Sequence, residues 1–218
     1  DQRPVNPLAD HGRLGRMSLP AHAPRPASPV VRAVTGMGML LAAMWTLEGV
    51  DTLTGHALDT WGISPRDVDE LPQVYSAWAL HFGWPHLIGN SVPLFVLGFL
   101  ILLESQRRWL VSGLASITGS GLFAWLFSPP NSVTAGASGL VFGWLTYLLA
   151  RGIFSRDWRQ ILLAVVVGAV YGSVLWGVLP LHEGVSWQGH LGGAIGGLGA
   201  AWYLHSPRRV RRRSTQSR

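Results

Sequence analysis

The chain has 218 residues, of which 48% are hydrophobic and 13% are charged, and its formal net charge is +6. The charged fraction is far below the roughly 25% of a soluble domain, so the composition is typical of a membrane protein. There is no cysteine, which excludes disulfides and thiolate metal sites. All basic residues are arginines. Their positions near the predicted membrane surface explain the positive charge without a nucleic-acid partner.

Six apolar spans follow a polar first segment. Residues 1–29 are rich in proline and predict a disordered tail. This tail contains no apolar run before a small-residue cleavage site, so we expect no secretory signal peptide in it. A basic tail, 206–218, ends the sequence. The predicted spans are 30–50, 86–103, 109–127, 135–150, 161–179 and 190–204.

The spans differ in length. The first, second, third and fifth approach the ~17–25 residues that a membrane helix needs. Sixteen residues, as in the fourth, reach only about 24 Å at 1.5 Å per residue, less than the ~30 Å hydrocarbon core. We therefore predict an all-α membrane protein in which residues 30–205 form one bundle of six transmembrane helices. The short fourth and sixth helices should be surrounded by the others, with one end sunk below the membrane surface.

The arginines predict the orientation of the bundle. Six spans put both termini on the same side of the membrane, and every arginine except Arg66 falls on that side. They lie in the tails, after the second span and after the fourth span, where Arg151, Arg156 and Arg159 follow. The positive-inside rule then places both termini in the cytoplasm. The opposite loops are acidic, with Asp51, Asp59, Asp67, Asp69, Glu70 and Glu183.

In this topology the second, fourth and sixth spans all begin on the outer side. The second begins with His86 and Asn90, whose i, i+4 spacing places them on one helix face. The fourth begins with Ser138 and the sixth with His190. These four side chains are predicted to converge at one depth in the membrane, with His81 just above them.

Each of these residues also has a purely structural explanation. A single His, Asn or Ser within a span often hydrogen-bonds to a neighbouring helix, and glycines spaced by four are typical of helix packing. The convergence of several polar groups favours a functional site, because such groups are costly within a membrane. Small residues on the sixth span also allow its backbone to approach the fourth, as a Ser138–His190 hydrogen bond requires.

The residue types indicate acyl-transfer chemistry. A serine becomes a nucleophile when an adjacent imidazole takes its proton. The Ser138 backbone N–H, the Asn90 amide and a His86 N–H are candidate donors to the oxyanion that follows. Glu48 and Glu104 lie at span ends far from His190. A Ser138–His190 dyad is therefore favoured over a triad.

The same residues resemble the motifs of the rhomboid intramembrane serine proteases. The family has His-x-x-x-Asn on its second core helix, Gly-x-Ser-Gly on its fourth and a His in a Gly-rich sixth. The matching segments are His86–Asn90, Gly136–Gly139 and Gly189–Gly197, and His81 matches an additional upstream His. The supporting residues of this set are His81, Gly136, Gly139, Phe142, Gly189 and Gly193.

The resemblance implies an endopeptidase that cleaves transmembrane segments of other proteins. Ser138 would be the nucleophile, His190 the base, and Asn90, His86 and the Ser138 amide the oxyanion hole. The family's long first loop, here 51–80, would dip into the outer leaflet, with Trp61, Leu71 and Trp78 as candidate contacts. The loop 180–189 would cap the site, and the fifth span would form the lateral entry.

Two features depart from the family. A Trp-Arg pair of the first loop is replaced by Pro72-Gln73, so the pairing within that loop should differ. The aromatic residue that stacks on the base, commonly Tyr, is Phe142.

Two further hypotheses remain open at this point. One is a catalytically silent rhomboid-like protein that binds membrane helices. The other is a transporter or metal-binding channel using His81, His86 and His190, although no membrane-embedded acidic partner and no inverted repeat accompany them. The protease hypothesis requires no cofactor and no metal, and its partners are a transmembrane substrate and membrane lipid.

Overall fold

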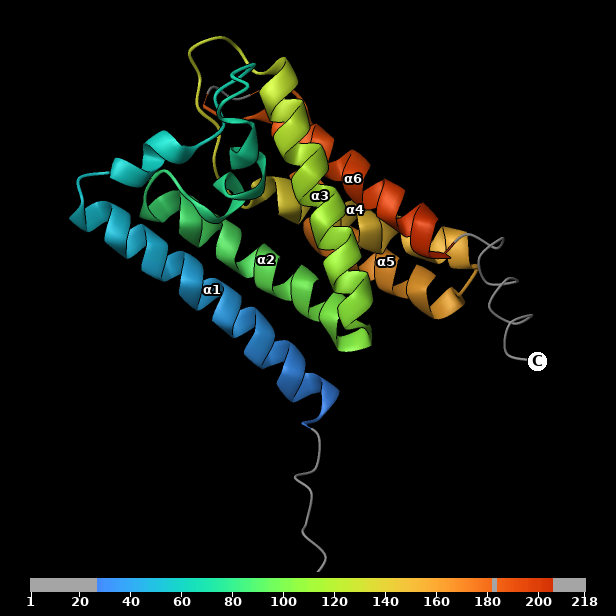
Figure 1. The fold of residues 1–218 in the computed structure, drawn as a ribbon. Coiled ribbons are helices and arrows are strands. Elements are labelled where there is room, and N and C mark those ends of the chain that lie inside the picture. The colour runs from blue at the N-terminus through green and yellow to red at the C-terminus, as the bar shows by residue number, and fades with distance from the viewer. Residues whose placement is uncertain (1–26, 182–183, 206–218) are drawn as a thin grey trace, which may run out of the picture.

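The computed structural model describes residues 27–181 and 184–205, so the predicted tails lie almost wholly outside the described residues. The described part is all-α (Figure 1). Its α-helices are α1 (Pro29–Leu53), α2 (Trp84–Glu104), α3 (Gln106–Phe127), α4 (Ser138–Ser155), α5 (Trp158–Tyr171) and α6 (Trp187–His205). Short 3₁₀ helices are η1 (Ala57–Trp61), η2 (Leu71–Tyr75), η3 (Ala77–Ala79) and η4 (Gly172–Val178).

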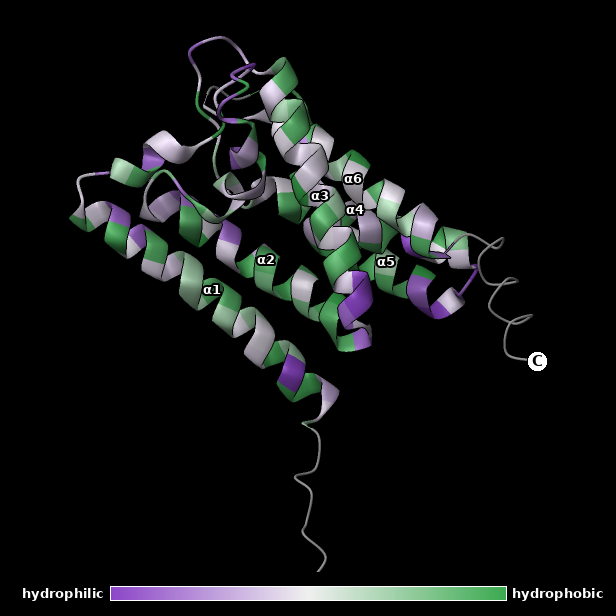
Figure 2. Ribbon diagram, in the orientation of Figure 1, coloured by the Kyte–Doolittle hydropathy of each residue, from purple (hydrophilic) through white to green (hydrophobic). Residues whose placement is uncertain are grey.

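Four stretches are long and apolar enough to cross a membrane: α1, α2, α3 and the α5–η4 segment Trp158–Val178. They correspond to the four spans that the sequence predicts to be long enough. The protein is therefore a multi-pass membrane protein, and apolar residues predominate in these helices, although α3 begins with a hydrophilic turn (Figure 2).

The shorter α4 is the central helix. It packs against α2, α3, α5 and α6. Its side chains Trp144, Tyr147 and Leu148 are almost completely buried. An 18-residue helix enclosed in this way does not need to match the membrane thickness, as the sequence analysis predicted.

Glycines allow α6 to lie directly on α4 and α3. A Cβ atom on Gly193 would overlap the carbonyl oxygen of Gly139, and one on Gly197 would overlap that of Gly143. On the neighbouring face of α6, a Cβ atom on Gly192 would overlap the carbonyl oxygen of Gly119 in α3. Only glycine permits backbones to approach this closely, so these residues determine where α6 can pack.

The first loop is tied to the end of α3. The Arg66 guanidinium donates to the carbonyl oxygen of Ser128 (2.9 Å), and the Trp125 indole donates to that of Asp67 (2.7 Å). Trp61 is exposed, whereas Trp78 is partly buried against the main core. The loop thus has its own pairing in the absence of a Trp-Arg pair, and Trp61 is the more exposed of the two tryptophans.

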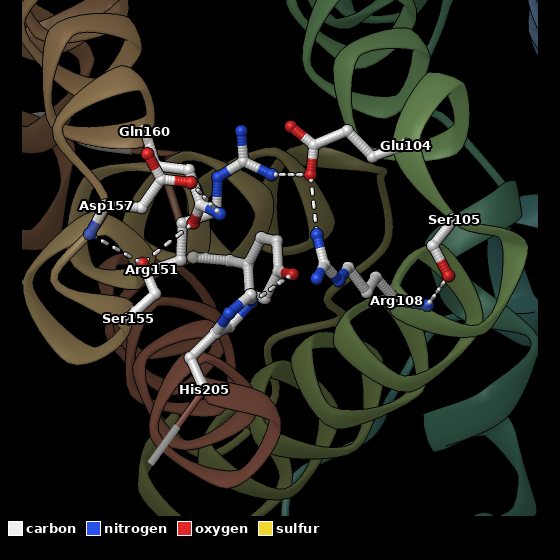
Figure 3. Close-up of polar contacts among 9 residues, drawn as sticks. Glu104, Ser105, Arg108, Arg151, Ser155, Asp157, Gln160 and His205 are labelled. Carbon is white, nitrogen blue, oxygen red and sulfur yellow. Dashed lines mark hydrogen bonds and ion pairs between the residues drawn. The ribbon is translucent and has the colours of Figure 1, made fainter. Parts of the chain in front are cut away.

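Two polar residues assigned to loops by the sequence analysis lie within helices instead. Arg151 is in α4 and completely buried, and Asp51 is in the last turn of α1 and buried. The Arg151 guanidinium pairs with the Glu104 carboxylate, which also binds Arg108 at 2.9 Å (Figure 3). Because Glu104 balances the charge, Arg151 can remain buried and α4 can continue one turn past its apolar segment.

Replacing Gly193 by alanine should destabilise the protein. The added Cβ overlaps the Gly139 carbonyl oxygen, so α6 must shift, at a cost of about 1–3 kcal/mol. The matched control is Gly199→Ala in the same helix, where no atom lies within 4 Å of the added Cβ. That variant should be neutral or stabilised by up to about 1 kcal/mol. Thermal unfolding in detergent compares the two, and equal melting temperatures would contradict the packing argument.

Candidate active site

Ser138 and His190 come together at the first turns of α4 and α6. The His190 Nε2 atom lies 2.8 Å from the Ser138 Oγ atom, within hydrogen-bond distance. Gly139 and Gly189 follow and precede these residues, and a Cβ on Gly139 would lie 3.2 Å from the Gly189 carbonyl oxygen. The small residues that let the helices approach thus also bring the serine and the imidazole together.

The other ring nitrogen of His190 is held by a backbone group. His190 Nδ1 lies 2.8 Å from the carbonyl oxygen of Gly177 in η4. A carbonyl only accepts, so Nδ1 carries the proton and Nε2 is free to accept from Ser138. Gly177 could not be identified from the sequence, because a backbone carbonyl in a 3₁₀ segment leaves no side-chain signal. A Cβ at this position would lie 3.2 Å from Nδ1 and 2.7 Å from the Phe142 ring.

Phe142 fixes the plane of the imidazole. The rings of Phe142 and His190 are stacked, with centroids 4.1 Å apart and an interplanar angle of 11°. Phe142 lies one turn after Ser138 and is buried. The ring at this position makes the contact that the family resemblance implies, without a hydroxyl group.

His86 lies over the turn that leads into α4. A Cβ on Gly136 would lie 2.5 Å from His86 Cε1, and the φ angle of Gly136 is +121°. Glycine is therefore required both by the backbone conformation and by the imidazole above it. His86 in turn meets the His81 ring edge-on at a centroid distance of 5.1 Å.

His81 supports the same turn from the first loop. Its Nε2 atom accepts a hydrogen bond from the Ala137 N–H at 3.3 Å. Burial and the nearby His86 lower the pKa of His81 to about 4, so the ring is neutral at pH 7 and can accept this bond. His81 thus positions the residue before Ser138 and does not approach the Ser138 hydroxyl.

Two donors that belong to residues lining one cavity have no acceptor in the described part of the chain. The Asn90 side chain is 8% exposed and its Nδ2 has no hydrogen-bond partner in the described part of the chain. Ser138 is the first residue of α4, so its N–H has no acceptor within the helix. Both residues line a cavity of about 780 Å³, together with His86, Gly136, Phe142 and His190. The segment 184–189 also lines this cavity, whereas residues 182–183 of the predicted cap lie outside the described residues.

Comparison with known proteins assigns the fold to a family. The model of the rhomboid domain matches residues 68–207. The chain belongs to the rhomboid family. An uncharacterized protein of Mycobacterium tuberculosis is 39% identical, covering 92% of this chain and 90% of the relative. An uncharacterized protein of Mycobacterium leprae is 43% identical over 79% of this chain and 71% of the relative.

A more distant relative of this rhomboid-family protein is described as a protease. The rhomboid protease GluP of Bacillus subtilis is 32% identical over 137 residues, which cover 59% of this chain and 25% of the relative.

Substituting Gly136 by alanine should lower the melting temperature strongly. The left-handed backbone alone costs about 1–3 kcal/mol, and the methyl group also collides with His86. Gly184→Ala is the control, since its φ is +75° and no atom lies within 4 Å of its added Cβ. A loss no greater than that of the control would show that His86 does not press on this turn.

Proposed function

We propose that this rhomboid-family protein is a serine endopeptidase that cleaves transmembrane segments of other membrane proteins with a Ser138–His190 dyad. The observation that carries the proposal is the 2.8 Å contact of His190 Nε2 with Ser138 Oγ, together with the Gly177 carbonyl behind Nδ1. This arrangement is the one that general-base activation of a serine requires. No cofactor takes part in the proposed reaction.

The reaction begins when His190 Nε2 takes the Ser138 hydroxyl proton as Oγ attacks the scissile carbonyl carbon. The resulting imidazolium shares its Nδ1 proton with the Gly177 carbonyl. The tetrahedral intermediate then collapses, and Nε2 gives the proton to the leaving amine. Water hydrolyses the acyl-enzyme by the same steps, with His190 again acting as the base. The Phe142 ring keeps the imidazole in one plane throughout.

The oxyanion would be bound by the Ser138 N–H, the Asn90 amide and an N–H of His86. Supporting this assignment, all three residues line the same cavity, and Asn90 Nδ2 lacks another acceptor. Since Ser138 is the first residue of α4, the positive end of the helix dipole also faces the site.

We further propose that all six α-helices cross the membrane and that both termini are cytoplasmic. The distribution of arginines supports this orientation, even though Arg151 is within α4 rather than in a connection. Ser138 and His190 would then lie towards the extracytoplasmic side. The ion pair of Glu104 with Arg151, at the other ends of α2 and α4, would face the cytoplasm.

A transmembrane substrate would enter beside α5. Only 6% of the α5–η4 segment is buried, compared with 17–33% for the other candidate spans. Most of this segment is therefore open to the surroundings of the bundle, and η4 carries the carbonyl that holds His190. The substrate helix would have to unwind locally, because the peptide bonds of a helix are shielded by its own hydrogen bonds.

The alternative is a catalytically silent rhomboid-like protein that binds membrane helices. The hydrogen-bonded serine and histidine favour the protease, since binding alone does not require an oriented base.

Cleavage of a fluorogenic transmembrane substrate by the purified protein in lipid tests the proposal. Ser138→Ala and His190→Ala should each abolish turnover above background, because one removes the nucleophile and the other the base. Ser173→Ala, at an exposed serine of η4 outside the cavity, should retain the activity of the wild type. Equal activity of all three variants would refute the dyad, and inactivity of the wild type on a panel of substrates would favour the silent protein.

Asn90→Ala should lower kcat by about 10²-fold with little change in KM, because one carboxamide donor to an oxyanion contributes ~10²–10³ in rate. Thermal unfolding checks that the variant remains folded. An unchanged kcat in a folded Asn90→Ala protein would remove this residue from the oxyanion hole.

A further inference from the structure

A second group of polar side chains lies where α1 ends and the first loop begins, outside the proposed catalytic site. Asp51, His56 and Asp59 each offer one ligand atom, and these atoms lie within 4.8 Å of one another. The junction of α1 with the following segment can be followed in Figure 1. The three residues come from the last turn of a helix, a turn and η1, so the fold brings them together.

The geometry of the group is held by the backbone. Asp51 Oδ1 accepts the Leu58 N–H at 2.7 Å, which orients Oδ2 towards His56. His56 Nδ1 lies 3.0 Å from Asp51 Oδ2 and 3.8 Å from Asp59 Oδ2. The φ angle of His56 is +64°, a left-handed conformation that is uncommon for residues other than glycine. A ligating carboxylate that is itself hydrogen-bonded, as Asp51 is by the Leu58 N–H, is typical of metal sites.

A third carboxylate points to a ligand at this position. Glu48 precedes Asp51 by one helical turn and is only 2% exposed. Neither of its oxygens makes a hydrogen bond of normal geometry, although the Gly83 amide lies close to them. Glu48 lines a small cavity together with Asp51 and Asp59. A buried carboxylate without a partner is costly, and a cation in this cavity would remove the cost.

No arginine balances the negative charge of these carboxylates in the described part of the chain. Within residues 27–181 and 184–205, the ion pairs of Asp51 and Asp59 are formed with His56 alone, and Glu48 forms none. Asp51, His56 and Asp59 thus form one group, and the Glu48 carboxylate lies beside Asp51 and Asp59 in the small cavity. His56 and Asp59 are 54% and 29% exposed, so an ion can reach the group from solvent.

We propose that Glu48, Asp51, His56 and Asp59 bind a divalent transition-metal ion, with Zn²⁺ as the best fit. An imidazole with carboxylates suits Zn²⁺, whereas Ca²⁺ and Mg²⁺ prefer oxygen ligands alone. Because each bond to zinc is about 2.1 Å, two ligand atoms of one ion lie at most about 4.2 Å apart. Both contacts of His56 Nδ1 satisfy this limit, and the partly exposed Asp59 can rotate to complete the set. Binding replaces the proton on Nδ1.

The ion would fasten the first loop to α1. Leu80 and His81 line the same small cavity as Glu48 and Asp51. His81 accepts the Ala137 N–H next to Ser138. The proposed ion is therefore structural and lies behind the turn that carries the serine, with no bond to the reacting atoms.

Titration of the full chain with Zn²⁺, purified without a histidine tag and treated with chelator, tests the site. Calorimetry should give one tight site per chain, and Zn²⁺ should raise the melting temperature. Asp51→Asn and His56→Asn should each weaken binding at least 10-fold. Asparagine keeps the acceptor for Leu58 and tolerates the left-handed conformation of residue 56. Asp69→Asn, an exposed carboxylate of the same loop, should bind as the wild type does.

Equal Zn²⁺ affinity in wild type and both variants would overturn the proposal, because the ion would then be held by other histidines. Absence of binding would equally overturn it and leave Glu48 as a protonated, buried acid. Binding of Ca²⁺ but not Zn²⁺ would contradict the transition-metal assignment. If Asp51→Asn does not fold, Asp59→Asn replaces it, since Asp59 is partly exposed. These measurements do not depend on peptidase activity.

Discussion

The geometry of this protein depends on how closely the backbones of α4 and α6 approach each other. Gly193 and Gly197 place their Cα atoms against carbonyl oxygens of α4, where no Cβ fits. The first turns of the two helices then lie at one level, and Ser138 and His190 come within hydrogen-bond distance. A membrane offers no hydrophobic force between helices, so this contact relies on van der Waals packing and interhelical hydrogen bonds. Thr146 Oγ1, which donates to the Ala194 carbonyl at 2.8 Å, is one such bond.

Polar groups lie at both ends of α4, but in different arrangements. Near the end of α4, Arg151 pairs with Glu104, and the Tyr147 hydroxyl lies 3.0 Å from His205 Nε2. These contacts balance charge and stabilise the ends of α2, α4 and α6. At the start of α4, Asn90 Nδ2 has no acceptor in the described part of the chain. A donor without an acceptor beside a cavity is available to a ligand, whereas the ion pair of Arg151 with Glu104 stabilises the fold.

The first loop connects the end of α1 with the turn before Ser138. It is held by α3 through Arg66 and Trp125, and it carries His81 against the turn before Ser138. Its own beginning contains the group of carboxylates around His56. Because the loop is held at these points, His81 can keep the turn before Ser138 in place. The loop therefore supports the site without contacting the reacting atoms.

The sequence by itself determined the all-α fold, the four long apolar spans and the short central helix, because hydropathy and span length are local properties. It also predicted that Ser138 begins a helix. Only the tertiary structure decided that the Gly177 carbonyl holds His190, that Arg151 is buried against Glu104, and that His56 meets two carboxylates. The direction of a carbonyl and the pairing of distant charges depend on the packing of whole helices, which leaves no periodic pattern in the chain.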